Sequence, residues 1–191
     1  QVDESNLASN TTVSFTGSFS NTPVYGADGA GTAITSTYAL GIKATAADSG
    51  LTDTATGQKV YLYLESGVVV GRVGVADAAS ATGNISFTVT NSNGSLTLDQ
   101  VRAITHPVTT NPDDAKSLLS ADLVTLTRTD TITDKDGDTN TGSNSINLGS
   151  AISFLDDGPS ITVSTTTPSA ASLQVDESNL ASNTTVSFTG S

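Results

Sequence analysis

The chain has 191 residues and a mass of 19.2 kDa, with 19 acidic residues against seven Lys and Arg and a formal net charge of −12. This excess of negative charge excludes the basic surface by which proteins bind nucleic acids and anionic membranes. The absence of Cys excludes disulfides and thiolate sites, and no apolar run approaches the roughly 18 residues of a membrane helix, so no membrane insertion is expected.

Alternation of apolar with small or polar residues predicts β-strands along most of the chain. Between two of these strands, residues 91–94 read Asn-Ser-Asn-Gly, which predicts a tight hairpin turn. In chain order, the predicted strands are residues 33–42, 59–64, 85–89, 96–98 and 123–133, an apolar series from 146 to 154, and residues 161–164.

Two segments predict short helices. One covers residues 98–105, with Thr97 or Asp99 as its cap, and the other covers residues 113–121, directly after Pro112. Many short strands joined by Gly and Asn turns favour an all-β fold over a parallel α/β sheet. We therefore expect an immunoglobulin-like or related β-sandwich with one or two short helices.

The chain repeats itself: residues 1–18 and 174–191 both read QVDESNLASNTTVSFTGS, at an offset of 173 residues. This period is far too long for a solenoid repeat, so each unit is expected to be a folded domain in a tandem array. We expect residues 1–159 to form one repeat unit and residues 160–191 to hold a linker, centred on 164–172, and the opening of the next unit. The expected partners are neighbouring identical repeats, end to end. Because the chain lacks Met, we expect it to be a processed or excised part of a longer protein.

The duplicated segment has its own apolar pattern. Val2, Leu7, Val13 and Phe15 are expected to be core positions of the complete unit, and the copy at 174–191 has the same pattern. A strand of this kind without its own domain is a template for β-augmentation, so the second copy could occupy the place of the first in another molecule. The sequence leaves open which copy completes the unit.

The densest acidic segment contains Asp134, Asp136 and Asp138, with Gly137 allowing a tight turn. Three carboxylates at alternate positions can converge on one hard cation, and Ca²⁺ prefers six to eight oxygen ligands. The segment is not an EF-hand, because its glycine is at the fourth position and Ser145 stands at the twelfth, where a bidentate Glu is required. The alternative interpretation is a solvated hairpin turn.

Further acids gather at the unit boundaries. They are Asp156 and Asp157 at the end of the unit, Asp3 and Glu4 at its start, and the copies Asp176 and Glu177. Adjacent carboxylates repel one another unless a positive charge lies between them, so these acids could share Ca²⁺ across a junction. The alternative is that they keep a long array soluble. The acids in segments 26–29 and 48–53 are explained mainly by turn chemistry.

Several motifs together resemble the long tandem extender repeats of giant repeats-in-toxin adhesins, which Gram-negative bacteria export by type I secretion. The matching segments are VDESNL at 2–7, GADG at 26–29, SGLTDTATG at 49–57, LTLDQVRAITH at 96–106, TDTITDKDGDT at 129–139 and INLGSAISFLDDGPSI at 146–161. The glycine-rich nonapeptide of the toxin β-roll is absent, so β-roll Ca²⁺ sites are not carried over.

The resemblance implies an extracellular β-sandwich at the bacterial cell surface, stiffened by Ca²⁺ and spacing a ligand-binding tip for adhesion and biofilm formation. An alternative is that the domain itself is a Ca²⁺-dependent sugar- or protein-binding module, but the chain has only four Tyr and five Phe to form a sugar platform. An enzyme is not expected, because nothing marks a carboxylate pair in a cleft, and no small-molecule substrate is expected. His106 is expected to lie at the surface or to cap an element.

Overall fold

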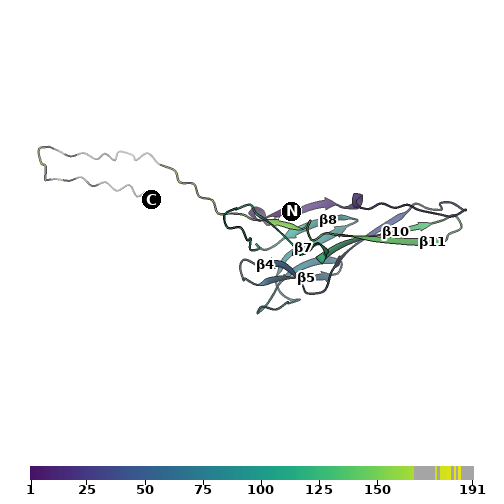
Figure 1. Cartoon of the computed structure of the whole chain (residues 1–191). Helices are drawn as coiled ribbons and strands as arrows, with labels where there is room; N and C mark the ends of the chain where they lie inside the picture. Colours follow the sequence, from purple (N-terminus) through teal and green to yellow (C-terminus); the bar gives the residue numbers. More distant parts are fainter. Residues whose placement is uncertain (166–174, 176, 182, 184, 186–191) are drawn as a thin grey trace. The chain divides into compact units, whose positions relative to one another are not determined.

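The structure is a computed structural model that describes residues 1–165, 175, 177–181, 183 and 185. The chain divides into two compact units, Gln1–Gly158 and Pro159–Ser191. All strands and helices of the described residues lie in the first unit, which is shown in Figure 1.

The larger sheet has six strands in the order β2-β8-β7-β6-β5-β4, and every neighbouring pair is antiparallel. Consecutive strands β4 to β8 form a meander, and β2 closes one edge. The strands are β2 (Thr11–Ser14), β4 (Ala47–Thr52), β5 (Lys59–Glu65), β6 (Val68–Val73), β7 (Ile85–Ser92) and β8 (Ser95–Gln100).

The turn between β7 and β8 is the predicted hairpin, and the structure confirms it. Asn93 and Gly94 both have positive φ, 50° and 84°, which is the conformation that matches the twist of the flanking strands. The Gly94 amide donates to Asn91 Oδ1 at 2.8 Å. A Cβ atom at Gly94 would lie 2.8 Å from Thr16 Cγ2, so a side chain at this position would displace the segment that follows β2.

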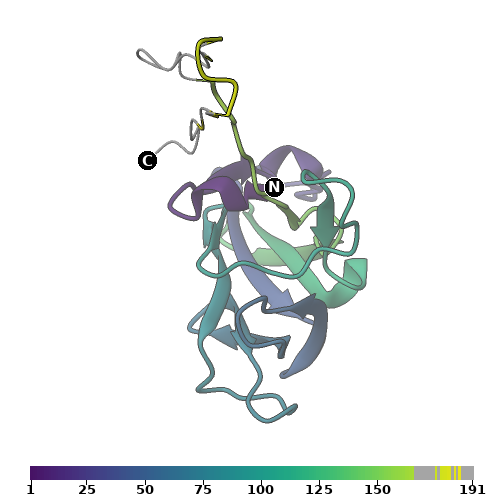
Figure 2. The same cartoon turned by 90° about the vertical axis from the view of Figure 1, so that its left-hand side faces the viewer.

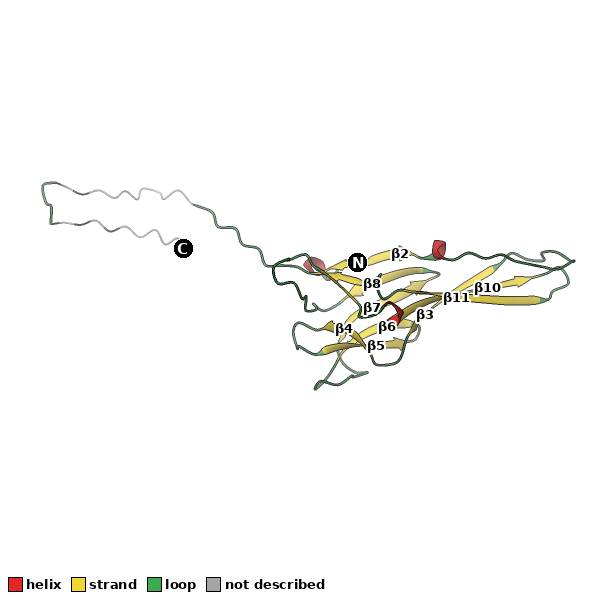
Figure 3. Ribbon diagram, in the orientation of Figure 1, coloured by secondary structure: helices red, strands yellow, loops and turns green. Residues whose placement is uncertain are grey.

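Two smaller sheets complete the unit. In the first, β10 (Val124–Thr133) pairs antiparallel with both β3 (Thr35–Ile42) and β11 (Thr139–Asn147). In the second, β12 (Ser153–Leu155) pairs in parallel with β1 (Val2–Asp3) and antiparallel with β9 (Ala115–Ser117). The helices of the described residues are the single 3₁₀ turns η1 (Glu4–Asn6), η2 (Thr16–Ser18) and η3 (Ala121–Leu123), drawn in red in Figure 3.

One hydrophobic core joins the three sheets, and Figure 2 shows the same unit turned by 90°. Leu40 of β3 and Leu126 of β10 face the six-stranded sheet, and the rings of Phe87 in β7 and Phe154 in β12 meet edge to face at 5.1 Å. Both Phe side chains are fully buried. The fold is therefore the expected all-β sandwich.

Neither predicted helix forms. Over 98–105, strand β8 continues to Gln100, because Leu96, Leu98 and Gln100 are buried at every second position while the backbone pairs with both β7 and β2. A helix would turn Val101 toward the core, yet this residue is 50 % exposed. Over 113–121, the short strand β9 pairs with β12 instead. Pairing within the sheets outweighs the local helix signals.

The segment 161–164 is not the predicted strand. These residues have no regular structure, and Ile161 and Val163 are 88 % and 86 % exposed.

In the duplicated segment, Val2 is buried as expected and Phe15 packs against the core. Leu7 is only half-buried, and Val13 is 48 % exposed on the edge strand β2, so the core assignment of Val13 was wrong. Residues 1–18 thus take their places within their own unit. The copies of Val13 and Phe15, at Val186 and Phe188, lie outside the described residues.

Asp130 on β10 gives the fold a dependence on pH. Its carboxylate accepts hydrogen bonds from Ser36 Oγ at 2.6 Å, Arg128 Nε at 2.7 Å and Asn21 Nδ2 at 2.9 Å. These bonds, that of Ser36 above all, lower the pKa of Asp130 to about 2. A carboxyl whose pKa is lower in the folded state adds stability above its unfolded pKa and loses it as the pH falls toward its folded pKa.

We therefore expect Asp130→Asn to lower the free energy of unfolding at neutral pH by about 1.5–3 kcal/mol, the size of a hydrogen bond to a charged group. The difference from the unaltered chain should shrink as the pH falls from about 4 toward about 2. Urea unfolding across this range measures it, with Asp113→Asn at an exposed position as the control. A difference that does not change with pH would contradict this role.

Candidate metal centres

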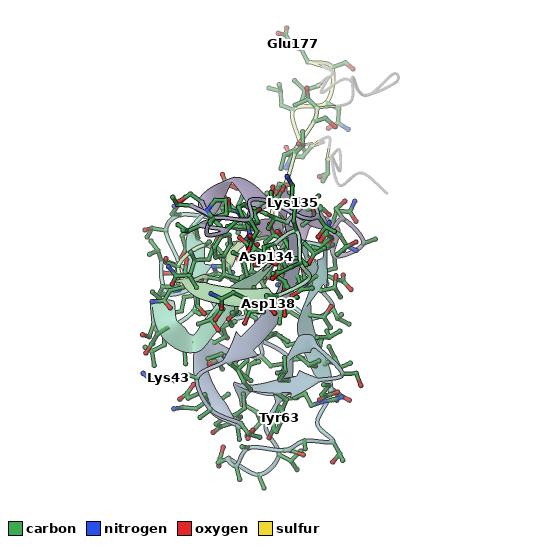
Figure 4. The ribbon with its side chains drawn as sticks, turned by 90° about the vertical axis from the view of Figure 1, so that its right-hand side faces the viewer. Lys43, Tyr63, Asp134, Lys135, Asp138 and Glu177 are labelled. Carbon is green, nitrogen blue, oxygen red and sulfur yellow. The ribbon has the colours of Figure 1, made fainter. Side chains whose placement is uncertain are left out.

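The first candidate centre lies in the turn between β10 and β11. The Asp134 amide donates to the Asp138 carbonyl at 3.0 Å, and Asp134 Oδ1 accepts from the amides of Asp138 at 2.9 Å and Gly137 at 3.2 Å. Gly137 has a φ of 102°, which explains the glycine at this position. Figure 4 shows Asp134 and Asp138 at this end of the unit, with Lys135 projecting away.

A second loop packs closely against this turn. The Gly31 amide donates to the Thr133 carbonyl at 2.9 Å, and Ala30 forms a β-bridge with Asp134. A Cβ atom at Gly31 would lie 1.9 Å from the Asp134 carbonyl oxygen, so only glycine permits this approach. The contact brings Asp28 to the turn from 106 positions away in the sequence.

Asp28, Asp134 and Asp136 form the resulting cluster, with one carboxylate oxygen of each within 4.8 Å of the others. The structure thus unites Asp134 and Asp136, as expected, and adds Asp28, which was expected to serve mainly in a turn. The Asp138 side chain is not in this group, although it lines a hollow of about 100 Å³ together with Asp134. No sequence signal pairs Asp28 with Asp134, because their proximity depends on the backbone approach at Gly31.

The closeness of the two turn carboxyls affects their pKa values in opposite directions. A hydrogen bond between the side chains of Asp134 and Asp136 lowers the pKa of Asp134 and raises the pKa of Asp136. Two negative charges at short range repel one another, which disfavours full ionisation of the pair. A divalent cation between them would relieve that repulsion, and carboxylate oxygens are the ligands that Ca²⁺ prefers. The hydrogen bonds that close the turn also fit the alternative of a plain hairpin.

The acids at the start of the unit have separate roles. Asp3 Oδ1 accepts from the Ser5 amide at 2.9 Å and caps η1, and hydrogen bonding to the side chain of Ser5, followed by that to its amide, lowers the pKa of Asp3. Glu4 instead turns inward, with its side chain 8 % exposed. Its Oε1 accepts from Gln100 Nε2 at 2.6 Å and from the Ile104 amide at 2.9 Å.

The second candidate centre contains Glu4, His106 and Asp156, with one ligand atom of each within 4.8 Å of the others. The parallel pairing of β1 with β12 places residue 4 beside residue 156, so acids from the start and the end of one unit meet inside that unit. Asp157 is exposed and outside this group. Sharing of a cation across a junction between units stays a prediction.

The expected surface or capping position of His106 is wrong, because the residue is buried. Its side chain is 2 % exposed. His106 Nε2 lies 3.5 Å from Glu4 Oε1, and Nδ1 lies 3.7 Å from Oδ2 of Asp114, which is itself 9 % exposed.

In the second unit, Glu177 is exposed and Asp176 lies outside the described residues.

The fold and the two centres define an acidic all-β sandwich domain with candidate cation sites. Residues 1–149 match the model of a family described as a domain of unknown function, DUF5801, and the chain therefore belongs to that family. No curated protein and no solved structure matches the chain. Among the described residues, no helix is both long and apolar enough to cross a membrane.

Proposed function

We propose that this domain is a Ca²⁺-stabilised structural spacer, one extender unit in a tandem array that projects the binding tip of an adhesin from the bacterial cell surface. In this proposal the domain is extracellular, performs no catalysis and contacts neighbouring identical units end to end. The resemblance of its motifs to adhesin extender repeats supports the cellular setting.

The observation that carries the proposal is the structural role of the duplicated segment. Within residues 1–18, β1 pairs with β12 and β2 pairs with β8, so this segment contributes strands to two sheets of its unit. Residues 174–191 repeat all of its letters. The second copy therefore has the residues that begin another such unit. Near-identical copies suit a domain whose number of repeats sets the length of the array.

The direction of the chain also suits an array. Strands β1 and β12 are parallel, so the chain finishes the unit in the direction in which it started. This shared direction is compatible with the end-to-end array that we propose. In Figure 1 the β10–β11 turn lies at one end of the first unit. The last residues of that unit, in light green, lie toward its opposite end.

A hollow of about 410 Å³ supports the second candidate, ligand binding by the domain itself. Phe19 and the amide side chains of Asn21, Asn140 and Asn144 line it, a combination that suits a sugar. Its charged wall residues, however, are engaged internally, since Asp130 accepts from Asn21, Arg128 and Ser36. We therefore favour the spacer.

Small-angle scattering from chains of one, two and three consecutive units tests this proposal. In Ca²⁺ we expect the maximum dimension to grow by the same increment with each added unit, because rigid units joined in line add their lengths. Growth with roughly the square root of unit number, as for freely jointed units, would contradict it. So would a compact particle in which the units pack side by side.

A further inference from the structure

The imidazole of His106 is buried among carboxylates without a hydrogen bond. Its side chain is 2 % exposed, and within the described residues neither Nδ1 nor Nε2 has a hydrogen-bond partner. The same holds for Oδ1 of the neighbouring Asp114. Buried polar side chains are nearly always hydrogen-bonded, so this cluster requires an explanation.

The distances fit ligands around an ion better than a hydrogen-bonded pair. Two atoms bound tetrahedrally to Zn²⁺ at about 2.0–2.2 Å lie roughly 3.3–3.6 Å apart. His106 Nε2 and Glu4 Oε1 are 3.5 Å apart, and Asp156 supplies a further oxygen within 4.8 Å. Such a set of three protein ligands leaves a fourth position for water.

Neighbouring residues also hold Glu4 and His106 in the way that outer-shell residues hold metal ligands in other proteins. Gln100 Nε2 and the Ile104 amide both donate to Glu4 Oε1 and fix that carboxylate. On the far side of the ring, His106 Nδ1 faces Asp114 Oδ2 at 3.7 Å. A carboxylate facing the second nitrogen of a metal-binding His sets its tautomer and orientation.

We propose that Glu4, His106 and Asp156 bind one Zn²⁺ or a similar divalent transition ion, with Nε2 as the imidazole ligand and Asp114 as a positioning residue. An imidazole nitrogen suits Zn²⁺, whereas Ca²⁺ takes oxygen ligands, so this site differs in kind from the Asp28, Asp134 and Asp136 cluster. The inference is independent of the proposed spacer function.

The ion would join three distant parts of the unit. Glu4 follows β1, His106 lies between β8 and β9, and Asp156 follows β12. The pairing of β1 with β12 consists of only two residue pairs, so the first and last strands of the unit are held by few backbone bonds. A bound ion would tie these strands together at the place where tension applied through the chain enters and leaves the unit.

The composition makes the test unambiguous. The chain has one His and no Cys, so an imidazole ligand can only come from His106 and no thiolate competes with it. The full chain is titrated with Zn²⁺, and with Co²⁺ as a spectroscopic probe, in the presence of millimolar Ca²⁺. The imidazole resonances of His106 are followed by NMR, and the stoichiometry is followed by calorimetry.

We expect one ion per chain, bound in the presence of Ca²⁺, with shifted ring resonances for Zn²⁺ and ligand-field absorption for Co²⁺. His106→Gln and Asp156→Asn should weaken binding at least about 100-fold, and Asp114→Asn about 10–100-fold, as for other residues that orient metal ligands. Asp157→Asn, which makes the same change of charge at the next, exposed residue, should leave binding unchanged.

Three results would overturn the inference. They are no saturable Zn²⁺ binding by the unaltered chain, ring resonances of His106 that do not shift when Zn²⁺ is added, or binding by His106→Gln as tight as that of the unaltered chain. The first two would be expected if the imidazole were instead protonated and paired with Glu4 and Asp114. Circular dichroism and melts in chelator establish that each variant is folded. The NMR arm uses the unaltered chain, so it decides the question even if a variant fails to fold.

Discussion

Ca²⁺ at about a hundred times the dissociation constant of its site should raise the melting temperature of the chain by roughly 5–10 °C. A ligand that binds only the folded state adds about 2.7 kcal/mol at this ratio, and each kcal/mol shifts the melting temperature of a domain of this size by about 2–4 °C. Mg²⁺ should have a much smaller effect, because it requires stricter octahedral geometry and loses water reluctantly.

The shift should depend on the cluster of Asp28, Asp134 and Asp136. Asp136→Asn removes one carboxylate from the group and should abolish most of the Ca²⁺-dependent shift, while Asp113→Asn, an exposed acid outside it, should not. In chelator, Asp136→Asn should melt no lower than the unaltered chain, since the change relieves repulsion with Asp134. Equal melts of the unaltered chain in chelator and in Ca²⁺ would contradict the site.

Arg102→Met should lower the free energy of unfolding by about 3–5 kcal/mol, because it leaves a buried carboxylate without its partner. Asp53 is fully buried, and its two oxygens accept from Arg102 Nε at 2.7 Å and Nη2 at 3.0 Å. Asp53 also forms a β-bridge with Ile104, so the ion pair holds the segment that leads to His106.

The matched control for this variant is Lys59→Met. Lys59 also pairs with an Asp, Asp48, but its side chain is 60 % exposed, and exposed pairs contribute about 0–1 kcal/mol. Urea unfolding of both variants measures the contrast. Equal effects of Arg102→Met and Lys59→Met would show that burial of Asp53 does not govern the strength of its pair.

Strands were predictable where apolar residues alternate with small or polar ones in the sequence. Strands β3, β5, β7 and β10 show this alternation over part of their length and were located correctly. Strand β6 was not predicted, because Val69 and Val70 are both buried and its apolar residues form a run without alternation. Strand β4 is mostly small and polar and is a strand because β5 pairs with it, which no local pattern reveals.

The candidate sites were predictable only where their ligands are neighbours in the sequence. Asp134 and Asp136 were identified from their spacing in one turn. Asp28 reaches them through the contact of Gly31 with the Asp134 backbone, which is a property of the folded chain. Glu4 and Asp156 were identified as boundary acids, but their meeting at His106 depends on the pairing of β1 with β12.

We expect Ca²⁺ to fix the spacing of successive units. Because the chain has no Cys, Thr110→Cys at an exposed loop position, introduced in each of two consecutive units, places two fluorophores at equivalent sites. Single-molecule energy transfer then reports the distance between the units. We expect one narrow distance distribution in Ca²⁺ and a broad one in chelator. Distributions that are equally broad in both conditions would show that Ca²⁺ does not fix the spacing.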